Sequence, residues 1–417
     1  MGFPSACGID FGTSNSTVSL PGPKGARLLA LEGAATTLPS AVFWEVGAST
    51  PVFGRAALDA YTGGDDGRLM RGLKSALGSD LIHEKTRIGN RALAFTDILG
   101  TFIGHLKLLA LAEAPALRHV VLGRPVHFVD DDAAGNSAAQ STLEKIARDQ
   151  GFDEVAFQYE PIAAALDYES RITTEDLVLI VDIGGGTSDF SVVRVSPDRA
   201  RAPDRAGDIL GNHGIRVGGT DFDRLLSLAR VMPQLGLGSE IGGKLPMPLH
   251  YFHDLATWHR INALYSAKTI TDLRQIKFDA ARPDLLDRLI HVLDTRAGHA
   301  LAMAVEAAKI DLSDQRETAL RVADLFGSAD IPASRAGFEA AVDKPVTRIM
   351  GAIAQVLAQA GVAPRDIGTV FMTGGSSSLP VMQAAVGLCL PGVAIATGDL
   401  LGSVGLGLAL DAKRQFG

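Results

Sequence analysis

The chain has 417 residues, of which 47% are apolar and 21% charged, and a net charge of -8. This length exceeds what one hydrophobic core usually organises, so we expect a soluble protein of two lobes that folds without disulfides. The negative charge argues against nucleic acid as the main partner, because a nucleic-acid-binding surface normally carries an excess of basic residues.

The N-terminus and the cysteines indicate the cellular compartment in which we expect the protein. The first residues, MGFPSACGID, contain no basic region followed by an apolar one, so no targeting segment is predicted. Cys7 and Cys389 are the only cysteines, and both lie in apolar runs. They indicate two small buried side chains in a reducing compartment, so we expect a cytoplasmic protein. The uncharged stretch 371–398 is interrupted by GGSSSLP and by a Pro-Gly pair, so it predicts core elements and no membrane span.

A β-hairpin is predicted at the start of the chain. Cys7-Gly-Ile leads into Asp10, and Thr17-Val-Ser-Leu returns as a second strand. The turn between them consists of Gly12, Thr13, Ser14 and Asn15. Backbone N–H groups of such a turn, with the threonine hydroxyl, can bind phosphate oxygens while the aspartate stands at the mouth of the hairpin.

A second hairpin repeats the pattern, with Asp182 standing 172 positions after Asp10. An unbroken apolar run at 177–181 predicts a strand buried on both faces. The turn that follows consists of Gly184, Gly185, Gly186 and Thr187. Three glycines permit positive φ and remove every Cβ, so backbone N–H groups can approach an anion closely.

The repetition is the informative feature of this sequence. One such hairpin alone would be an ordinary tight turn. Two hairpins from the two halves of a chain can face each other and enclose a triphosphate. Mg²⁺ would then be held at Asp10 and Asp182, because it is usually shared between carboxylates, waters and substrate phosphates. We therefore predict two similar lobes with a nucleotide, ATP or ADP, between them.

Six segments in order resemble the nucleotide-binding domain of the seventy-kilodalton heat-shock (DnaK-type) chaperones, in the superfamily of actin and the sugar kinases. GIDFGTSNSTV and DIGGGTSDFSV resemble its two phosphate motifs, and GGTDFDRLL (218–226) the segment after the second. YEPIAAALDYE (159–169) and GDLLGSVGLGLAL (398–410) are similar to the two lobe connectors, and FMTGGSSSLPVMQ (371–383) to the adenosine motif. The resemblance covers nearly the whole chain, and FHDLATWHRINALY (252–265) further suggests the YegD-like branch.

The resemblance implies an α/β protein with the two-lobed actin-like ATPase fold, in which two RNase H-like lobes each carry an outer subdomain. Lobe I would comprise residues 1–172, with an outer subdomain near 40–97. Lobe II would comprise residues 173–395, with an outer subdomain near 227–318. Residues 396–417 would form a C-terminal helix that returns to lobe I. Because the peptide-binding half of the family would follow here, the chain is expected to lack it.

Two residues gain their predicted catalytic roles from the resemblance. By position alone, Glu160 is an acid at a helix N-terminus, where the helix dipole favours it, and Lys74 would be a solvated surface lysine. By resemblance, Glu160 orients the attacking water and Lys74 reaches the γ-phosphate. Asp10 and Asp182 would organise Mg²⁺ and water, and Thr187 would place its hydroxyl beside the transferring phosphoryl. Catalysis would then rest on positioning and charge stabilisation.

The predicted base site lies on a helix. Glu306, Lys309 and Ser313 are spaced by three and four, which places them on one helix face, a pattern that by itself is an ordinary polar face. By resemblance they contact adenosine, and the predicted ATP-binding set is completed by Gly218, Gly219, Gly374, Gly375, Ser376 and Asp399. Ile310 and Ser378 stand where the family usually has arginines that pack on adenine. We therefore expect weak base affinity and poor ATP selectivity.

Two other patterns predict no site. GSEIGGKL (238–245) has the spacing of a P-loop, but Leu245 replaces the Ser or Thr that would bind Mg²⁺ and no buried strand precedes it. His250, His253 and His259 lack the spacing that would put two metal ligands on one helix face.

The sequence thus predicts a Mg-dependent ATP-binding protein of heat-shock type with weak ATPase activity. It would switch by lobe closure between ATP and ADP states and signal to an unknown protein partner, with neither nucleic acid nor membrane as a partner. Two other classes stay open: a small-molecule kinase of the same superfamily, and a nucleotide-binding module or actin-like filament former with little turnover. ATP turnover distinguishes the ATPase from the nucleotide-binding module or filament former. Phosphate transfer to a metabolite identifies the kinase.

Overall fold

The computed structural model describes residues 3–23, 25–129, 132–169, 172–202, 204–243, 245–326, 329–397 and 402–417. The chain divides into two compact units. Unit 1 consists of Met1–Arg216, Gly351–Ser377 and Val386–Gly417, and unit 2 of Val217–Met350 and Ser378–Ala385. The lobe boundaries expected from the sequence, after residues 172 and 395, stay a prediction.

The first sheet of unit 1 contains the predicted N-terminal hairpin. Its strands are β1 (Ala6–Phe11), β2 (Asn15–Gly22), β3 (Gly25–Leu28), β4 (Thr37–Pro39), β10 (His119–Arg124) and β11 (Glu154–Tyr159). The strand order is β11-β10-β1-β2-β3, with β4 also paired to β2. β1 and β2 are antiparallel, whereas β1, β10 and β11 run parallel. Helices α2 (Phe95–Glu113) and α3 (Ala133–Asp149) share one apolar core with this sheet, in which Phe102 and Leu143 join Ile9 and Phe11.

The second sheet of unit 1 repeats this topology. Its strands are β12 (Asp176–Ile183), β13 (Ser188–Val195), β14 (Ile209–Ile215), β19 (Thr369–Thr373) and β20 (Ala394–Thr397). The order is β14-β13-β12-β19-β20, in which the β12–β13 hairpin is antiparallel and β12, β19 and β20 run parallel. Two sheets with the same hairpin and the same parallel neighbours confirm the predicted α/β class and its RNase H-like repeat.

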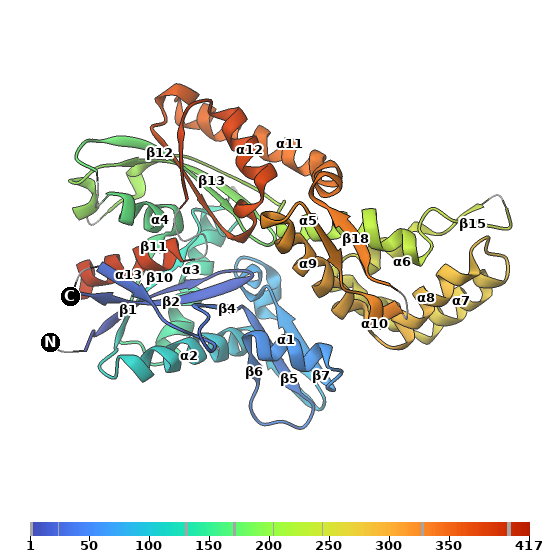
Figure 1. The fold of residues 1–417 in the computed structure, drawn as a ribbon. Coiled ribbons are helices and arrows are strands. Elements are labelled where there is room, and N and C mark those ends of the chain that lie inside the picture. Colours follow the sequence, from blue (N-terminus) through green and yellow to red (C-terminus); the bar gives the residue numbers. More distant parts are fainter. Residues whose placement is uncertain are drawn as a thin grey trace. The chain divides into compact units, whose positions relative to one another are not determined.

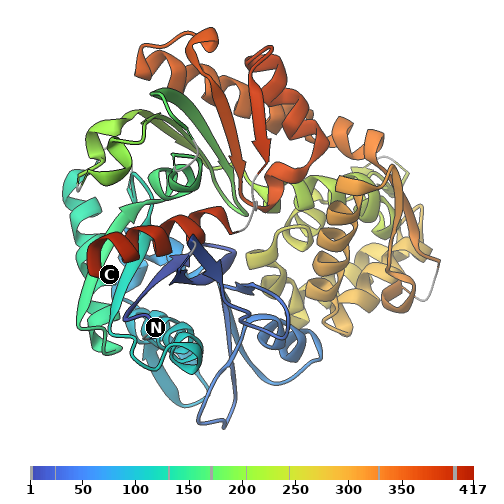
Figure 2. The same cartoon turned by 60° about the vertical axis from the view of Figure 1, so that its left-hand side comes forward.

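Two helices, α4 (Glu160–Glu169) and α13 (Ser403–Phe416), lie between the two sheets (Figures 1 and 2). One apolar cluster contains Val121 of the first sheet, Ile180 of the second, Ala164 of α4 and Leu408 of α13. The helices approach so closely that a Cβ at Gly407 would clash with the backbone carbonyl of Ala163. The contact between the two helices is therefore made by small residues.

The outer part of unit 1 carries Lys74. Its elements are β5 (Ala41–Glu45), β6 (Val52–Phe53), α1 (Gly54–Thr62), β7 (Gly67–Arg71), the 3-10 turns Leu73–Ala76 and Asp80–His83, β8 (Lys85–Ile88) and β9 (Arg91–Ala94). β5 pairs with both β6 and β7, and β8 with β9.

Unit 2 is mainly helical. Its helices include α5 (Gly219–Leu226), α6 (Leu249–Leu255), α7 (Ala267–Phe278), α8 (Pro283–Asp294), α9 (Gly298–Asp314) and α10 (Ala323–Phe326), and its short strands are β15 (Glu240–Ile241), β16 (Leu245–Pro246), β17 (Glu317–Leu320) and β18 (Ile331–Ser334). Helices α11 (Arg335–Ala360) and α12 (Pro380–Cys389) belong to both units. α5 and α9, which carry four of the predicted adenosine contacts, pack against each other.

Among the described residues, one helix, α2, is long and apolar enough by length and composition to cross a membrane. Its Ile98, Phe102 and Leu106 are fully buried in the core of the first sheet. Its apolar character is thus accounted for by packing inside unit 1.

The contact between α4 and α13 generates a stability prediction. We expect Gly407→Ala to destabilise the protein by roughly 1–3 kcal/mol, because the new methyl group meets the rigid carbonyl of Ala163. Gly351→Ala in α11 is the matched control, since nothing lies within 4 Å of its added Cβ. The control should be neutral or stabilising by up to about 1 kcal/mol, as expected for Gly to Ala in a helix. Denaturant unfolding measures both, and equal midpoints for the two variants would contradict the packing.

Candidate nucleotide site

The two predicted turns meet within unit 1. Gly185, in the turn after β12, lies so close to Ser14, in the turn after β1, that a Cβ at position 185 would overlap the Ser14 Oγ. A side chain at this position would therefore push the two turns apart. The polar turn of the first hairpin and the glycine turn of the second thus face each other, although they come from distant parts of the chain.

Carboxylates stand beside this meeting point. Asp10 lies on β1 opposite Thr17, and Asp182 lies on β12. A Cβ at Gly123 of β10 would lie 3.3 Å from Glu160 Cγ and 3.6 Å from Asp10 Oδ1, so these two side chains flank one spot. Asp10, at the end of a strand of the first sheet, and Glu160, at the start of α4, thus approach each other.

Lys74 joins the carboxylates through an ion pair. Its Nζ lies 2.5 Å from Glu160 Oε1, and the two side chains are only 12% and 15% exposed. Lys74 lies in a 3-10 turn that is entered through Gly72, whose φ of 65° favours glycine. A Cβ at Gly72 would lie 3.8 Å from the methyl group of Thr13, which places this turn beside the first hairpin. Lys74 is therefore a partly buried partner of Glu160 and not a solvated surface lysine.

Burial and neighbouring charges shift the pKa values of Asp10, Asp182 and Lys74. The pKa of Asp182 is raised from 3.8 to about 8, first by burial and then by neighbouring carboxylates, of which Asp189 contributes most. Burial and Glu160 likewise raise the pKa of Asp10, while Lys74 lowers it. Burial lowers the pKa of Lys74, but the surrounding carboxylates outweigh burial, so its pKa is raised. A further cation would favour the charged forms of these acids.

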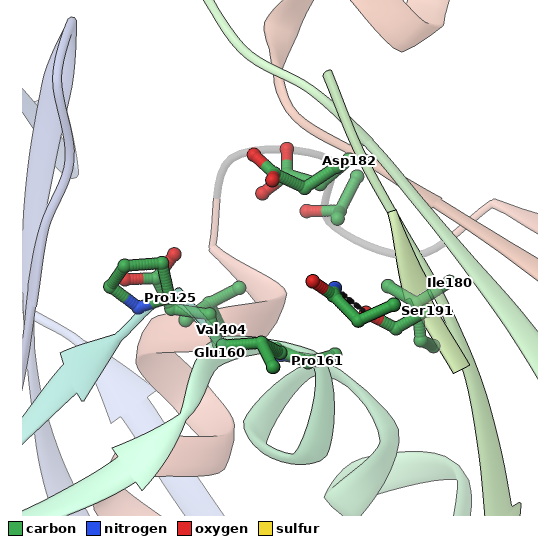
Figure 3. A pocket seen from close by; sticks show the side chains of 11 residues that line it. Pro125, Glu160, Pro161, Ile180, Asp182, Ser191 and Val404 are labelled. Atoms are coloured by element: carbon green, nitrogen blue, oxygen red, sulfur yellow. Dashed lines mark hydrogen bonds between the residues drawn. The ribbon is translucent and has the colours of Figure 1, made fainter. Parts of the chain in front are cut away.

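A small cavity of about 20 Å³ lies between α4 and the second sheet (Figure 3). Asp182 and Glu160 lie on opposite sides of it, and the other polar side chains that line it are Asp189, Ser191, Asn212 and Thr373. Asn212 Nδ2 donates a hydrogen bond of 2.8 Å to Ser191 Oγ. This volume suffices for one water molecule, and the polar lining offers it several partners.

The sequence reasoning missed the residues of this cavity that follow the second turn. Asp189 lies directly opposite Asp182 in the antiparallel register of β12 and β13, so its carboxylate faces the same region. The segment DIGGGTSD begins and ends with these two acids, and this was the signal that could have identified Asp189. Asn212 carries no such signal, because only its place on β14, next to Ser191 of β13, brings it to the cavity.

The predicted segment Gly374, Gly375 and Ser376 follows β19 and packs on the second hairpin. Gly374 has a φ of 81°, and a Cβ there would clash with Asp182 Oδ1. Ser376 Oγ donates a 3.5 Å hydrogen bond to the carbonyl of Gly184. This segment therefore contacts both the acid and the glycine turn of the second hairpin.

The remaining described candidates lie in unit 2. Lys309 of α9 is 7% exposed, and its ammonium forms an ion pair of 2.8 Å with Asp223 and donates to the Gly219 carbonyl at 3.4 Å. The backbone N–H of Gly218 donates to the Asp221 carboxylate at the start of α5. Lys309 thus holds the first turn of α5, a partner that its spacing in α9 did not reveal.

Glu306 and Ser313 share α9 with Lys309, and both are half-buried. Ile310, which stands where an arginine was expected, is 58% exposed. Ser378, the second such position, belongs to unit 2 as well. Asp399 lies outside the described residues.

The chain is similar to known proteins of the Hsp70 type. The family model for Hsp70 protein matches residues 78–231 and 288–391. The chain is also 25% identical over 434 aligned residues to the chaperone protein HscA of Serratia proteamaculans (strain 568). That alignment covers 99% of this chain and 58% of the HscA sequence, so the chain spans a little more than half the length of this relative.

The crowded carboxylates generate a prediction for the ligand-free protein. Because the pKa of Asp182 rises from 3.8 to about 8 on folding, its contribution to stability is present at low pH and is lost as pH rises through this window. Asp182→Asn removes the buried charge, so its melting temperature should exceed that of the parent, by an amount that grows from pH 5 to pH 8. Thermal unfolding in the presence of a chelator measures this difference.

Asp65→Asn is the matched control, because Asp65 is exposed. It should leave the melting temperature unchanged across the same pH range. A lower melting temperature for Asp182→Asn at pH 8 would show that the carboxylate is stabilised by its surroundings, contrary to this reading.

Proposed function

The chain belongs to the Hsp70 family, and we propose that it binds ATP and hydrolyses it to ADP and phosphate at the two hairpin turns of unit 1. The observation that carries the proposal is the contact of the glycine turn at Gly185 with the polar turn at Ser14, beside the Lys74–Glu160 ion pair. Two turns rich in backbone donors, with a lysine beside the first of them, suit a polyphosphate.

The phosphate contacts in this proposal come from both hairpins. The first turn (Gly12, Thr13, Ser14 and Asn15) and the second (Gly184, Gly185, Gly186 and Thr187) would contact phosphate oxygens through backbone N–H groups other than that of Gly184, which donates to the Thr187 carbonyl at 2.9 Å. The absence of side chains at three successive positions of the second turn supports this, because it lets an anion reach the backbone. The hydroxyl of Thr187 would lie beside the transferring phosphoryl group.

The residues also fit a divalent cation. Asp10 and Asp182 are carboxylates with raised pKa values, which is a charge arrangement that a cation would stabilise. Mg²⁺ would be held by these two acids together with waters and phosphate oxygens. When bound, it would neutralise charge on the phosphates.

Hydrolysis would depend on Glu160 and Lys74. Glu160 would accept a hydrogen bond from the attacking water and orient it, and the cavity next to its carboxylate has room for one water. Lys74 would stabilise the negative charge on the transferring phosphoryl, a role that the neighbouring acids support by keeping it protonated. The reaction consumes ATP and water and yields ADP and phosphate.

The adenosine contacts are proposed for Gly218, Gly219, Glu306, Lys309, Ser313, Gly374, Gly375, Ser376 and Asp399. Lys309 would act mainly by holding α5 through Asp223, since its ammonium is buried there. With Ile310 and Ser378 in place of arginines, no cation is expected on either face of the base. We further propose that ATP and ADP favour different degrees of lobe closure and that a cytoplasmic protein partner responds to the difference.

The central test is hydrolysis under single-turnover conditions. We expect Glu160→Gln and Lys74→Ala to raise the barrier by about 2–4 kcal/mol, because each removes a group that acts on the transferring phosphoryl. Calorimetry with Mg²⁺ and ATP should show one site for the parent and for both variants, and weaker binding for Asp182→Asn. Arg118→Gln is the matched control, because this exposed surface residue lies outside the site.

The alternatives give different outcomes. Binding without turnover by the parent would favour a nucleotide-binding module or a filament former. Transfer of labelled phosphate to a metabolite instead of water would favour a small-molecule kinase. Unchanged Mg²⁺-ATP binding by Asp182→Asn would contradict the site.

The base site generates a separate prediction. Ile310→Arg and Ser378→Arg, introduced together, should tighten ATP binding and increase the preference for ATP over GTP, since a guanidinium stacked on the base contributes on the order of 1 kcal/mol per face. Competition binding with both nucleotides measures this. The double variant Ile310→Gln/Ser378→Gln controls for added size without charge. If it binds ATP as tightly as the double arginine variant does, the base lies elsewhere.

A further inference from the structure

A buried ion cluster joins the C-terminal end of α4 to the connection between β13 and β14. Glu169, the last residue of α4, accepts two hydrogen bonds from the Arg205 guanidinium, from Nη1 at 2.9 Å and from Nη2 at 2.6 Å. Arg205 Nε donates to Asp208, which also accepts from Arg199. The side chains of Glu169, Arg205 and Asp208 are 0%, 2% and 5% exposed.

Each charge of the cluster has an oppositely charged partner, yet stability alone does not account for it. Two carboxylates and one guanidinium are buried, and the second guanidinium, that of Arg199, is 33% exposed and also pairs with Glu175. Removing ions from water costs several kcal/mol each, and well-packed apolar side chains of the same volume are often at least as stabilising. An arginine that donates two parallel hydrogen bonds to one carboxylate fixes the relative position of the two side chains.

The middle of α4 packs through small residues. In the middle of the helix, Ala163, Ala164 and Ala165 are buried, and Gly407 of α13 lies against the backbone of Ala163. Small residues interdigitate less than large side chains do, so this part of the interface resists a shift along the helix axis less than a contact of large side chains would. Contacts at the ends of α4 therefore contribute to its axial position.

The end contacts include the Lys74–Glu160 ion pair and the Glu169–Arg205 pair. The Tyr168 hydroxyl, beside Glu169, also donates to Asp176 at 2.9 Å. α4 has 10 residues, so its ends are about 15 Å apart. At the far end, the backbone N–H of Ser196 also donates to Glu169 at 3.2 Å. Ser196 directly follows β13, the strand that begins with Ser188 and Asp189. The far end of α4 is thus attached to the hairpin that carries Asp182 and Asp189.

We propose that Arg205 and Glu169 are positioning residues that set the place of the Glu160 carboxylate relative to the second hairpin. Asp208 orients Arg205 through the guanidinium Nε. Loss of the paired geometry lets α4 shift along α13 and displaces Glu160 from the attacking water. The inference rests on the proposed function, because it assigns a role toward the hydrolysis that Glu160 promotes there.

The test compares single-turnover hydrolysis and ATP binding in variants of the full chain. Arg205→Lys keeps the charge but loses the two-pronged contact, and Glu169→Gln keeps the shape but loses the charge. We expect each to slow hydrolysis roughly 10- to 100-fold, the range expected when a reacting group is displaced by about 1 Å, with ATP affinity within about twofold of the parent. Arg274→Lys on α7, which alters a solvent-exposed pair with Asp294, is the matched control and should behave as the parent.

Combination with Glu160→Gln separates positioning from general damage. If the cluster acts through Glu160, adding Arg205→Lys to Glu160→Gln produces no further loss of rate. A further 10-fold loss in that background, or a parental rate for both single variants, overturns the inference. If a single variant does not fold, the double variant Arg205→Met/Glu169→Leu replaces it, because Asp208 stays paired with Arg199. The melting temperature of this double variant should be near that of the parent, and it should hydrolyse ATP slowly.

The two proposals fail in different ways. If Glu160→Gln hydrolyses ATP at the parental rate, the proposed role of Glu160 is wrong and the inference falls with it. If Glu160→Gln is slow while the Arg205 and Glu169 variants are not, only the inference is wrong.

Discussion

The close contact of α4 with α13 is the constraint on which the rest of unit 1 depends. Gly407 lies against the backbone of Ala163, and the next two residues of α4 are alanines, so the two helices between the sheets lie close together. Residues of both sheets share one apolar cluster with these helices. The hairpin turns at Ser14 and Gly185, one from each sheet, lie in contact within the same unit. A larger residue at position 407 would push α4 and α13 apart.

The charges of unit 1 are arranged in two different ways on the two ends of the same helix. At its start, Lys74 pairs with Glu160 and also lies near Asp10 and Asp182, whose pKa values are raised. At its end, each buried carboxylate is in contact with a guanidinium group. The first arrangement leaves an excess of negative charge that a bound cation would offset, whereas in the second each buried charge already has an opposite charge in contact. Functional sites commonly carry such unbalanced charge at a cost to stability.

Much of the fold could be predicted from the sequence because its signals are local. An apolar run at 177–181 followed by three glycines defines a buried strand and a tight turn whatever surrounds them. The same pattern around Asp10 indicated a repeat, and the structure confirms it as two sheets of one topology. The start of the helix at Glu160 is also predicted by local sequence, since an acid and a proline are favourable in the first turn of a helix.

Only the tertiary structure decided which partners the charged side chains have. Lys74 and Glu160 are 86 positions apart, and Lys309 and the Gly219 carbonyl 90. Glu169 and Arg205 are 36 apart. No spacing in a sequence reveals such pairs, because each depends on how separate elements pack. Local chemistry thus determined where backbone donors and acids occur in this protein, and packing determined which of them meet, since an ion pair in a folded chain forms between neighbours in space.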